Sequence, residues 1–237
     1  HHLHLSEMDI GYFDPHCHLI PPLRSQRDRD ALRKALADHT IDAVCSDHCP
    51  VDDDAKQLPF SESEPGASGL DLLLHNYQQD IGKDFTAYRH HCYRVLNLAF
   101  WHSDHSEQSL EKIALACAFH DLAIWVCHNF DYIDPSVALA QQYLQQQGLS
   151  DWSADINLLI SEHHKVTACD DNKLAEAFRK ADWTDVSLGL LNFGLDRALL
   201  RALYQTFPTA GFHWRLVQLS AAHFVKHPLK PLPMLKW

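Results

Sequence analysis

The stretch Ile113-Ala-Leu-Ala-Cys-Ala-Phe-His-Asp121 runs through seven apolar residues and then places a histidine and an aspartate side by side. An uninterrupted apolar run inside a longer helical pattern indicates a buried helix. Neighbouring helical side chains diverge, so a single apolar face cannot account for both His120 and Asp121. A carboxylate buried at the end of such a helix must be paired with a charge or bound to a metal.

Working outward from this stretch, glycine and proline are rare between His75 and Pro208, and apolar residues recur at helical spacing. Gly148 and the pair Ser150-Asp151 are typical of a helix end followed by a helix start. The pattern predicts a mainly α-helical part with helices at 84–102, 107–127, 136–147, 151–164, 171–191, 195–206 and 211–226.

Residues 1–74 have a different character, with prolines and glycines spread throughout. One helix is predicted from Ser25 to Asp38, followed by a buried strand from Thr40 to Cys45. This α/β segment is too small to close an independent core of its own. We therefore predict two domains, 1–74 and 75–237.

Composition excludes some functions. No apolar run approaches the roughly 20 residues that span a bilayer, and no signal peptide opens the chain, so we expect a cytoplasmic protein without membrane contacts. Seven scattered cysteines without a C-x-x-C pair indicate reduced thiols. A net charge of −11 disfavours a nucleic-acid surface. The start at His1 rather than at a methionine suggests a piece of a longer gene product.

The chain contains 19 histidines, which is what a metal site requires. His91, the pair His120-Asp121 and Asp182 form an ordered set, each member on a different predicted helix, with roughly 30 and 60 residues between members. Taken alone, His91 would be a surface or core histidine and Asp182 a solvated acid. The ordered set is what points to a shared cation.

This set, with Arg94-Val95 after the first histidine, resembles the HD-domain superfamily of metal-dependent phosphohydrolases across about residues 75–237. The resemblance implies an HD-domain helical bundle with His91, His120, Asp121 and Asp182 as metal ligands. His91 is chosen over His90 because it alone gives Arg94 and Val95 the spacing of the family.

Two imidazoles and two carboxylates suit an octahedral Mn, Fe, Co, Ni or Mg ion better than closed tetrahedral zinc. The resemblance implies hydrolysis of a small phosphorylated substrate, a phosphomonoester or phosphodiester related to nucleotides. Asp121 would act at the centre of the chemistry, and Lys165 and Arg94 could contact phosphate. Surface salt bridging is the alternative for both cations.

Three further histidines, His128, His163 and His164, are candidates for a second metal site or for contacts around the first. Some HD proteins use additional histidines between the HD pair and the last aspartate to hold a second metal. Alternatively, His163 or His164 hydrogen-bonds a ligand or the substrate.

The N-terminal segment carries Pro21-Pro-Leu-Arg24, then Ile41-Asp-Ala-Val-Cys-Ser-Asp-His-Cys-Pro50, then Glu64-Pro-Gly-Ala-Ser-Gly69. It is similar to the C-terminal end of dihydroorotase, which implies the last strands of a (β/α)₈ barrel. Asp47 would then be the aspartate of the eighth strand, a metal ligand. Ile20 and Val51 stand where active members carry asparagine and histidine, as in the non-catalytic dihydroorotase-like proteins that accompany aspartate transcarbamoylase in some bacteria.

Three hypotheses for function follow. The first is an HD-type phosphohydrolase, and the second is a non-catalytic regulatory HD module with a dihydroorotase-like assembly fragment. The third is dihydroorotase itself, a cyclic-amide hydrolase, which we expect the chain to lack because Asp47 alone cannot hold the metals. The sequence does not decide whether the chain forms a homo-oligomer.

Overall fold

The computed structural model of the chain describes residues 1–3, 5–11, 13–38, 40–41, 51, 53–66, 69–230 and 232–235. The chain divides into two compact units, His1–His75 and Asn76–Trp237. Within the described ranges, regular structure is helical and no residue lies in a β-strand. The prediction of a mainly α protein is confirmed for this part of the chain, and the assignment to an HD-domain bundle stays a prediction.

The first unit contains short helical elements around a small core. The elements are η1 (Glu7–Ile10), η2 (Pro15–Cys17), α1 (Gln26–Ala37), α2 (Asp53–Lys56) and α3 (Gly69–Asn76). Leu5, Leu19 and Leu23 form its buried apolar cluster. The helix predicted at 25–38 is found as α1. Most of the predicted strand, and with it Asp47, lies outside the described residues, so the barrel origin of this unit stays a prediction.

The second unit is a set of packed helices. They are α4 (Gln78–Ile81), η3 (Gly82–Asp84), α5 (Phe85–His102), α6 (Glu107–Phe119), α7 (Ala123–Val126), α8 (Ile133–Gln146), η4 (Ser150–Trp152), α9 (Ser153–Glu162), α10 (Lys173–Val186), α11 (Arg197–Thr206) and α12 (Phe212–Lys226). The predicted helices match these bounds within a few residues, with two exceptions. The helix expected at 107–127 breaks into α6 and α7, and the one expected at 171–191 ends at Val186.

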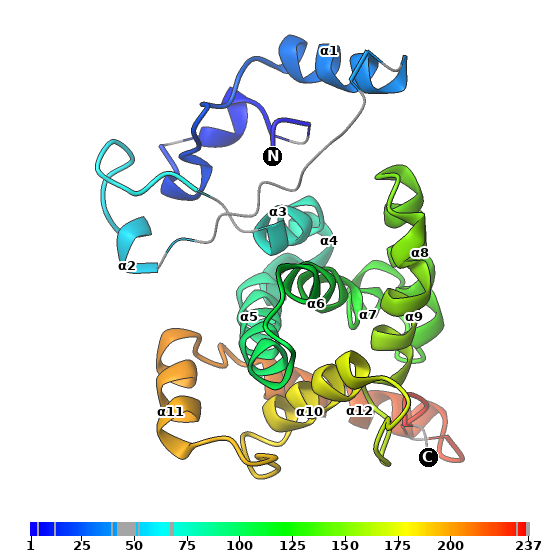
Figure 1. Cartoon of the computed structure of the whole chain (residues 1–237). Coiled ribbons are helices and arrows are strands. Elements are labelled where there is room, and N and C mark those ends of the chain that lie inside the picture. Colours follow the sequence, from blue (N-terminus) through cyan, green and yellow to red (C-terminus); the bar gives the residue numbers. More distant parts are fainter. Residues whose placement is uncertain are drawn as a thin grey trace. The chain divides into compact units, whose positions relative to one another are not determined.

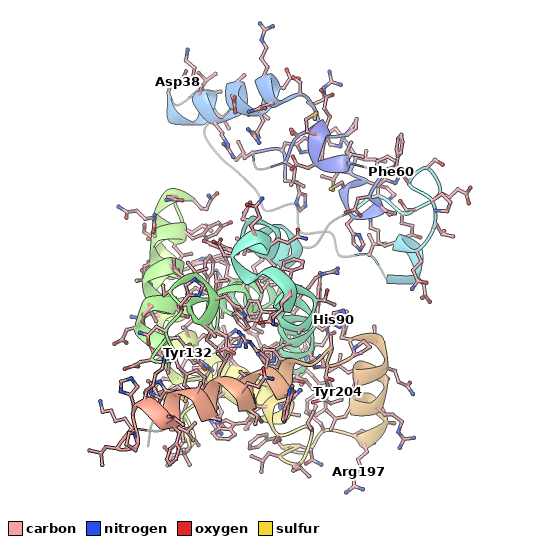
Figure 2. The ribbon with its side chains drawn as sticks, turned by 180° about the vertical axis from the view of Figure 1, so that it is seen from behind. Asp38, Phe60, His90, Tyr132, Arg197 and Tyr204 are labelled. Carbon is pink, nitrogen blue, oxygen red and sulfur yellow. The ribbon has the colours of Figure 1, made fainter. Side chains whose placement is uncertain are left out.

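Helix α6 lies at the centre of this unit, where it packs against α5, α8 and α9, while α5 also packs along α10 (Figure 1). Residues 113–119 are all buried, which is why this stretch is apolar on every side. Side chains fill the space between these helices, as the view from behind shows (Figure 2). The break after Phe119 leaves His120 and Asp121 inside the unit.

The helix ends follow from local sequence. The Ser106 hydroxyl and the Asn172 side chain accept hydrogen bonds from backbone N–H groups in the first turns of α6 and α10. Gly148, with a φ of +69°, follows the end of α8, where its lack of a Cβ allows the left-handed turn. Helix α8 includes Pro135 in its first turn, where no intrahelical N–H bond is lost.

No helix among the described residues combines the length and the apolar character needed to cross a bilayer. The five described cysteines are free thiols.

Asn172→Ala should lower the free energy of unfolding by about 1 kcal/mol, because it removes the acceptor for the Ala175 N–H at the start of α10. Urea denaturation followed by circular dichroism measures the loss. Asn172→Asp keeps the acceptor and is the matched control. Equal destabilisation by both variants would show that the cap does not hold this helix end.

Candidate metal centre

Six imidazole and carboxylate side chains from four segments meet inside the helical unit. His91 comes from α5 and Asp182 from α10, while His120-Asp121 and His163-His164 directly follow the last residues of α6 and α9. Their ligand atoms form two adjacent groups, His91 with His120 and Asp182, and Asp121 with His163 and His164. All are buried except His164, which is partly exposed. The structure thus brings together the four predicted ligands and two of the three further histidines.

The ligand atoms of the first group lie close together, and one oxygen of Asp121 lies beside them. His91 Nε2 lies 2.9 Å from His120 Nε2 and 3.6 Å from Asp182 Oδ1. Asp121 Oδ2 lies 3.7 Å and 3.6 Å from the same two nitrogens. Ligands about 2.1 Å from a shared ion are separated by about 3.0–3.4 Å, depending on the coordination angle. The observed separations of 2.9–3.7 Å bracket this range, so small side-chain shifts would let the four atoms hold one cation.

The second group uses the other oxygen of each carboxylate. Asp121 Oδ1 lies 3.5 Å from His163 Nε2, and Asp182 Oδ2 lies 3.4 Å from His164 Nδ1. Each aspartate thus turns one oxygen toward each group. Two carboxylates in this arrangement can bridge two neighbouring cations.

Hydrogen bonds at the far side of each ring decide which nitrogen faces the cluster. His120 Nδ1 and His163 Nδ1 lie 2.9 Å and 2.6 Å from the carbonyl oxygens of Cys117 and Ile160. A carbonyl only accepts, so each Nδ1 carries the proton and each Nε2 presents a lone pair. His91 Nδ1 donates in the same way to Asp185 Oδ2 at 2.7 Å.

In His164, the fourth ring, the two nitrogens exchange these roles. His164 Nε2 lies 2.7 Å from the hydroxyl oxygen of Tyr132, one of the residues labelled in Figure 2. When this Nε2 donates to the hydroxyl, His164 Nδ1 presents its lone pair toward Asp182. All four rings can therefore point a free lone pair inward, as metal coordination requires.

Without a cation this arrangement is electrostatically unfavourable. The lone pairs of His91 Nε2 and His120 Nε2 face each other at 2.9 Å. Asp121 Oδ1, both oxygens of Asp182 and His163 Nε2 are buried and have no hydrogen-bond partner. Buried polar atoms are nearly always paired, and an unpaired carboxylate oxygen is especially costly. A divalent cation in the first group would satisfy the two facing lone pairs and Asp182 Oδ1, and a cation in the second group would satisfy the remaining atoms.

The pKa values of His120 and Asp182 agree with this picture. Burial lowers the pKa of His120 to about 3, so its ring is neutral and able to coordinate. Burial also raises the pKa of Asp182 to about 7, because two carboxylates share a site that water does not solvate. Burial works to lower the pKa of His163, but the neighbouring Asp121 and Asp182 carboxylates raise it, so a cation there would compete with a proton on this ring.

The ends of α6 and α9 position the pairs His120-Asp121 and His163-His164. His120 and His163 each occupy the position just beyond a helix, and each ring bonds to the carbonyl three residues earlier. The segment after His164 is held to α10, because Trp183 Nε1 and Arg179 Nη1 both donate to the Lys165 carbonyl oxygen.

The position of Arg94 contradicts its predicted role as a phosphate contact. Arg94 is fully buried, and its Nε and Nη2 donate to the two oxygens of Asp185 at 2.6 Å and 2.9 Å. Its Nη1 donates to the carbonyl oxygens of Phe207 and Pro208. Arg94 is therefore bonded inside the protein, and the prediction that it contacts a phosphate is wrong.

Asp185 was missed in the sequence, although a signal was present. It follows Asp182 by three residues on α10, which places both carboxylates on one face of the helix. Burial alone would raise its pKa, but the hydrogen bonds from His91 and Arg94 hold the pKa well below the usual range. Asp185 is thus a charged acceptor fixed behind the cluster.

The other candidates lie elsewhere. His128 is exposed and belongs to neither group. Lys165 is partly exposed, with its Nζ 3.8 Å from Glu162 Oε2. His90 turns its ring to the Pro208 carbonyl oxygen rather than to the cluster. Asp47 lies outside the described residues.

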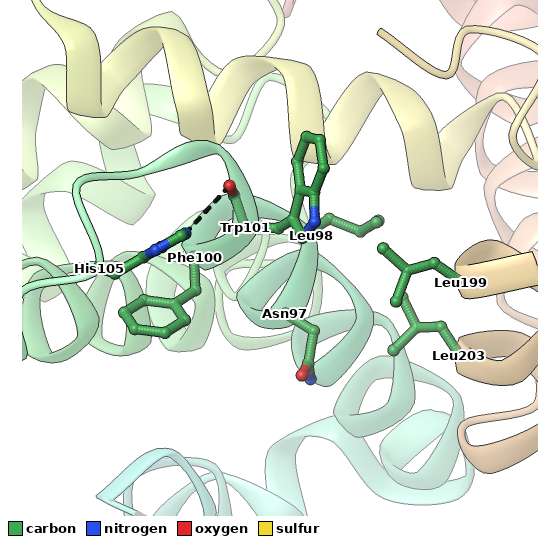
Figure 3. A pocket seen from close by; sticks show the side chains of 7 residues that line it. All are labelled: Asn97, Leu98, Phe100, Trp101, His105, Leu199 and Leu203. Atoms are coloured by element: carbon green, nitrogen blue, oxygen red, sulfur yellow. Dashed lines mark hydrogen bonds between the residues drawn. The ribbon is translucent and has the colours of Figure 1, made fainter. Parts of the chain in front are cut away.

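Access to the cluster is narrow. The side chain of His164 is 12% exposed, whereas those of Asp121 and Asp182 are 4% and 1% exposed. A pocket of about 580 Å³ lies elsewhere in the unit and is lined by Asn97, Leu98, Phe100, Trp101, His105, Leu199 and Leu203 (Figure 3). It contains no residue of the cluster, so it is not the entrance to it.

Comparisons with known proteins give partial matches. The chain is 49% identical over 57 residues to a dihydroorotase-like protein of Pseudomonas aeruginosa, which is 24% of this chain and 14% of that protein. It is 43% identical over 70 residues to a dihydroorotase-like protein of Pseudomonas putida, 30% of this chain and 16% of that one. It is 41% identical over 86 residues to a dihydroorotase of Bacillus licheniformis, 35% and 20% respectively. No family model and no solved structure matches the chain.

These findings overturn the assignment to an HD-type phosphohydrolase. The relatives are named for dihydroorotase, which hydrolyses a cyclic amide, and no family model supports an HD domain. The matches support a dihydroorotase-like fragment instead. The chain spans only about a seventh to a fifth of the length of these relatives.

Arg94→Met should lower the free energy of unfolding by about 3–5 kcal/mol, because it leaves the Asp185 carboxylate buried without its cation. Chemical denaturation in the presence of a chelator measures the loss. Lys180→Met, which removes a partly exposed ion pair with Glu176, is the control and should cost under about 1 kcal/mol. Similar values for both would contradict a buried structural role for Arg94.

Proposed function

We propose that the chain is a metal-binding, dihydroorotase-like hydrolase whose cation site lies in the helical unit, among His91, His120, Asp121 and Asp182. The observation that carries the proposal is the convergence of inward-facing lone pairs and unpartnered carboxylate oxygens in a buried space. Two carboxylates also balance the charge of one divalent cation. The site therefore fits such an ion in size, donor type and charge.

The donor set favours Mn, Fe, Co, Ni or Mg in an octahedral site with further positions for water over a closed tetrahedral zinc site. A second cation would be held by Asp121, His163 and His164, with Asp182 beside them. The alternative for His163 and His164 is hydrogen bonding to a ligand of the first cation.

A bound divalent cation lowers the pKa of a coordinated water and stabilises negative charge that develops during hydrolysis. The protein's part is to hold the six side chains rigidly and to exclude bulk water. His164 is the most exposed of the six, so a substrate would approach beside it. Tyr132 fixes the orientation of that ring from behind.

Cyclic-amide hydrolysis is the substrate class that the relatives' names favour. A binding module without turnover is the remaining alternative, favoured by the narrow access to the cluster.

Asp121→Asn should abolish tight binding of Mn²⁺ and Co²⁺ by the chain, because it removes a ligand charge from both groups. Isothermal titration calorimetry measures the affinity, and elemental analysis measures the metal content. At 100 times its dissociation constant, a cation should stabilise the wild-type chain by about 2.7 kcal/mol and raise its Tm by about 5–10 °C.

His128→Asn is the matched control. It removes an exposed imidazole outside the cluster, and asparagine tolerates the positive φ of this position. It should bind metal like the wild-type chain. His163→Ala should reduce two bound equivalents to one if the second group also holds a cation. Absence of metal binding by the wild-type chain would end the proposal.

The metal-loaded wild-type chain should open the ring of dihydroorotate if the centre carries the activity named for its relatives, and Asp121→Asn should not. Loss of the ring absorbance and appearance of the open-chain acid measure turnover. Metal binding without ring opening would exclude the cyclic-amide hypothesis and favour a binding module.

A further inference from the structure

The Asp185 carboxylate joins the candidate metal centre to a buried arginine. Its Oδ2 accepts from His91 Nδ1 at 2.7 Å and from Arg94 Nη2 at 2.9 Å, and its Oδ1 accepts from Arg94 Nε at 2.6 Å. Asp185 and Arg94 are both fully buried. The two-point contact with a planar guanidinium fixes the carboxylate in one orientation.

Among the four rings of the cluster, His91 alone is held at its outer nitrogen by a charged group. His120 and His163 bond to backbone carbonyls, and His164 bonds to a hydroxyl. The ring face of His91 is also fixed, because Phe212 stacks on it at 4.0 Å with an interplanar angle of 14°. Edge and face contacts together leave His91 one orientation, with Nε2 toward the cluster.

The backbone of Asp185 makes further bonds, which are weaker than the charge-assisted contacts of its side chain. Its carbonyl oxygen lies 2.8 Å from His213 Nε2 and accepts from the Tyr204 hydroxyl at 3.2 Å. Arg94 Nη1 reaches the carbonyls of Phe207 and Pro208 in the same segment. Residues of α11, of α12 and of the segment between them thus hold Asp185 and Arg94 in place.

We propose that Asp185, oriented by Arg94, is a positioning residue that fixes the Nδ1–H tautomer and the ring orientation of His91, so that its Nε2 is ready to bind the cation. This inference rests on the proposed metal-binding function. Outer hydrogen-bond partners of metal-bound histidines commonly change metal affinity by roughly 10–100-fold when they are removed.

Asp185→Asn should weaken Mn²⁺ and Co²⁺ binding by roughly 10–100-fold in calorimetric titrations. Tyr204→Phe is the matched control, because it removes a bond to the Asp185 backbone and leaves both carboxylate contacts. Its affinity should stay within about twofold of the wild-type value, well short of the loss expected for an outer partner. If Asp185→Asn does not fold, Arg94→Lys keeps the charge and loses the two-point contact. It should weaken binding more than Tyr204→Phe does.

A second readout separates positioning from general stability. Nitrogen-15 spectra of the metal-free chain, assigned by comparison with His91→Gln, should show a single Nδ1–H tautomer for His91. In Asp185→Asn, or in Arg94→Lys if that variant is used, both tautomers should appear. Unchanged affinity together with an unchanged tautomer would overturn the inference. A wild-type chain that binds no metal would overturn the proposed function, whereas the tautomer spectra would still test the role of Asp185.

Discussion

Two buried carboxylates facing four inward-pointing imidazoles are the constraint on which the helical unit depends. Packing of α5, α6, α9 and α10 brings Asp121 and Asp182 into a space that water does not solvate. The same packing leaves three of their four oxygens buried without hydrogen-bond donors. Apolar burial along α6 must therefore hold the site together against its own electrostatics until a cation is bound. Such a site lowers the stability of the metal-free fold, and binding of a cation restores that stability.

Much of the helical fold could be predicted from the sequence, because its helix boundaries are local. Caps such as Asn172 and the glycine at 148 act within a few residues, so the chain shows them directly. The break between α6 and α7 was not predicted. Apolar residues resume directly after His120-Asp121, and no glycine or proline marks the break in the sequence.

The metal site was predicted in part for a similar reason. Side-chain chemistry and order along the chain were enough to recognise four of the ligands, His91, His120, Asp121 and Asp182. Buried imidazoles and carboxylates that come together are typical metal ligands. The role of Arg94 could not be recognised in this way, because a sequence shows a charge and not whether that charge is buried. The predicted phosphohydrolase reaction was wrong for a different reason. A set of metal ligands indicates that a cation binds, but it does not determine the substrate.

The positions of His120 and His163 just beyond the ends of α6 and α9 have a consequence for how such a centre can arise. The last helical turn supplies the carbonyl that aims each ring, so no partner side chain needs to be acquired together with the histidine. Any two helices that end near each other over a buried acid already offer half of this coordination sphere. Single substitutions at those two ends would supply the imidazoles.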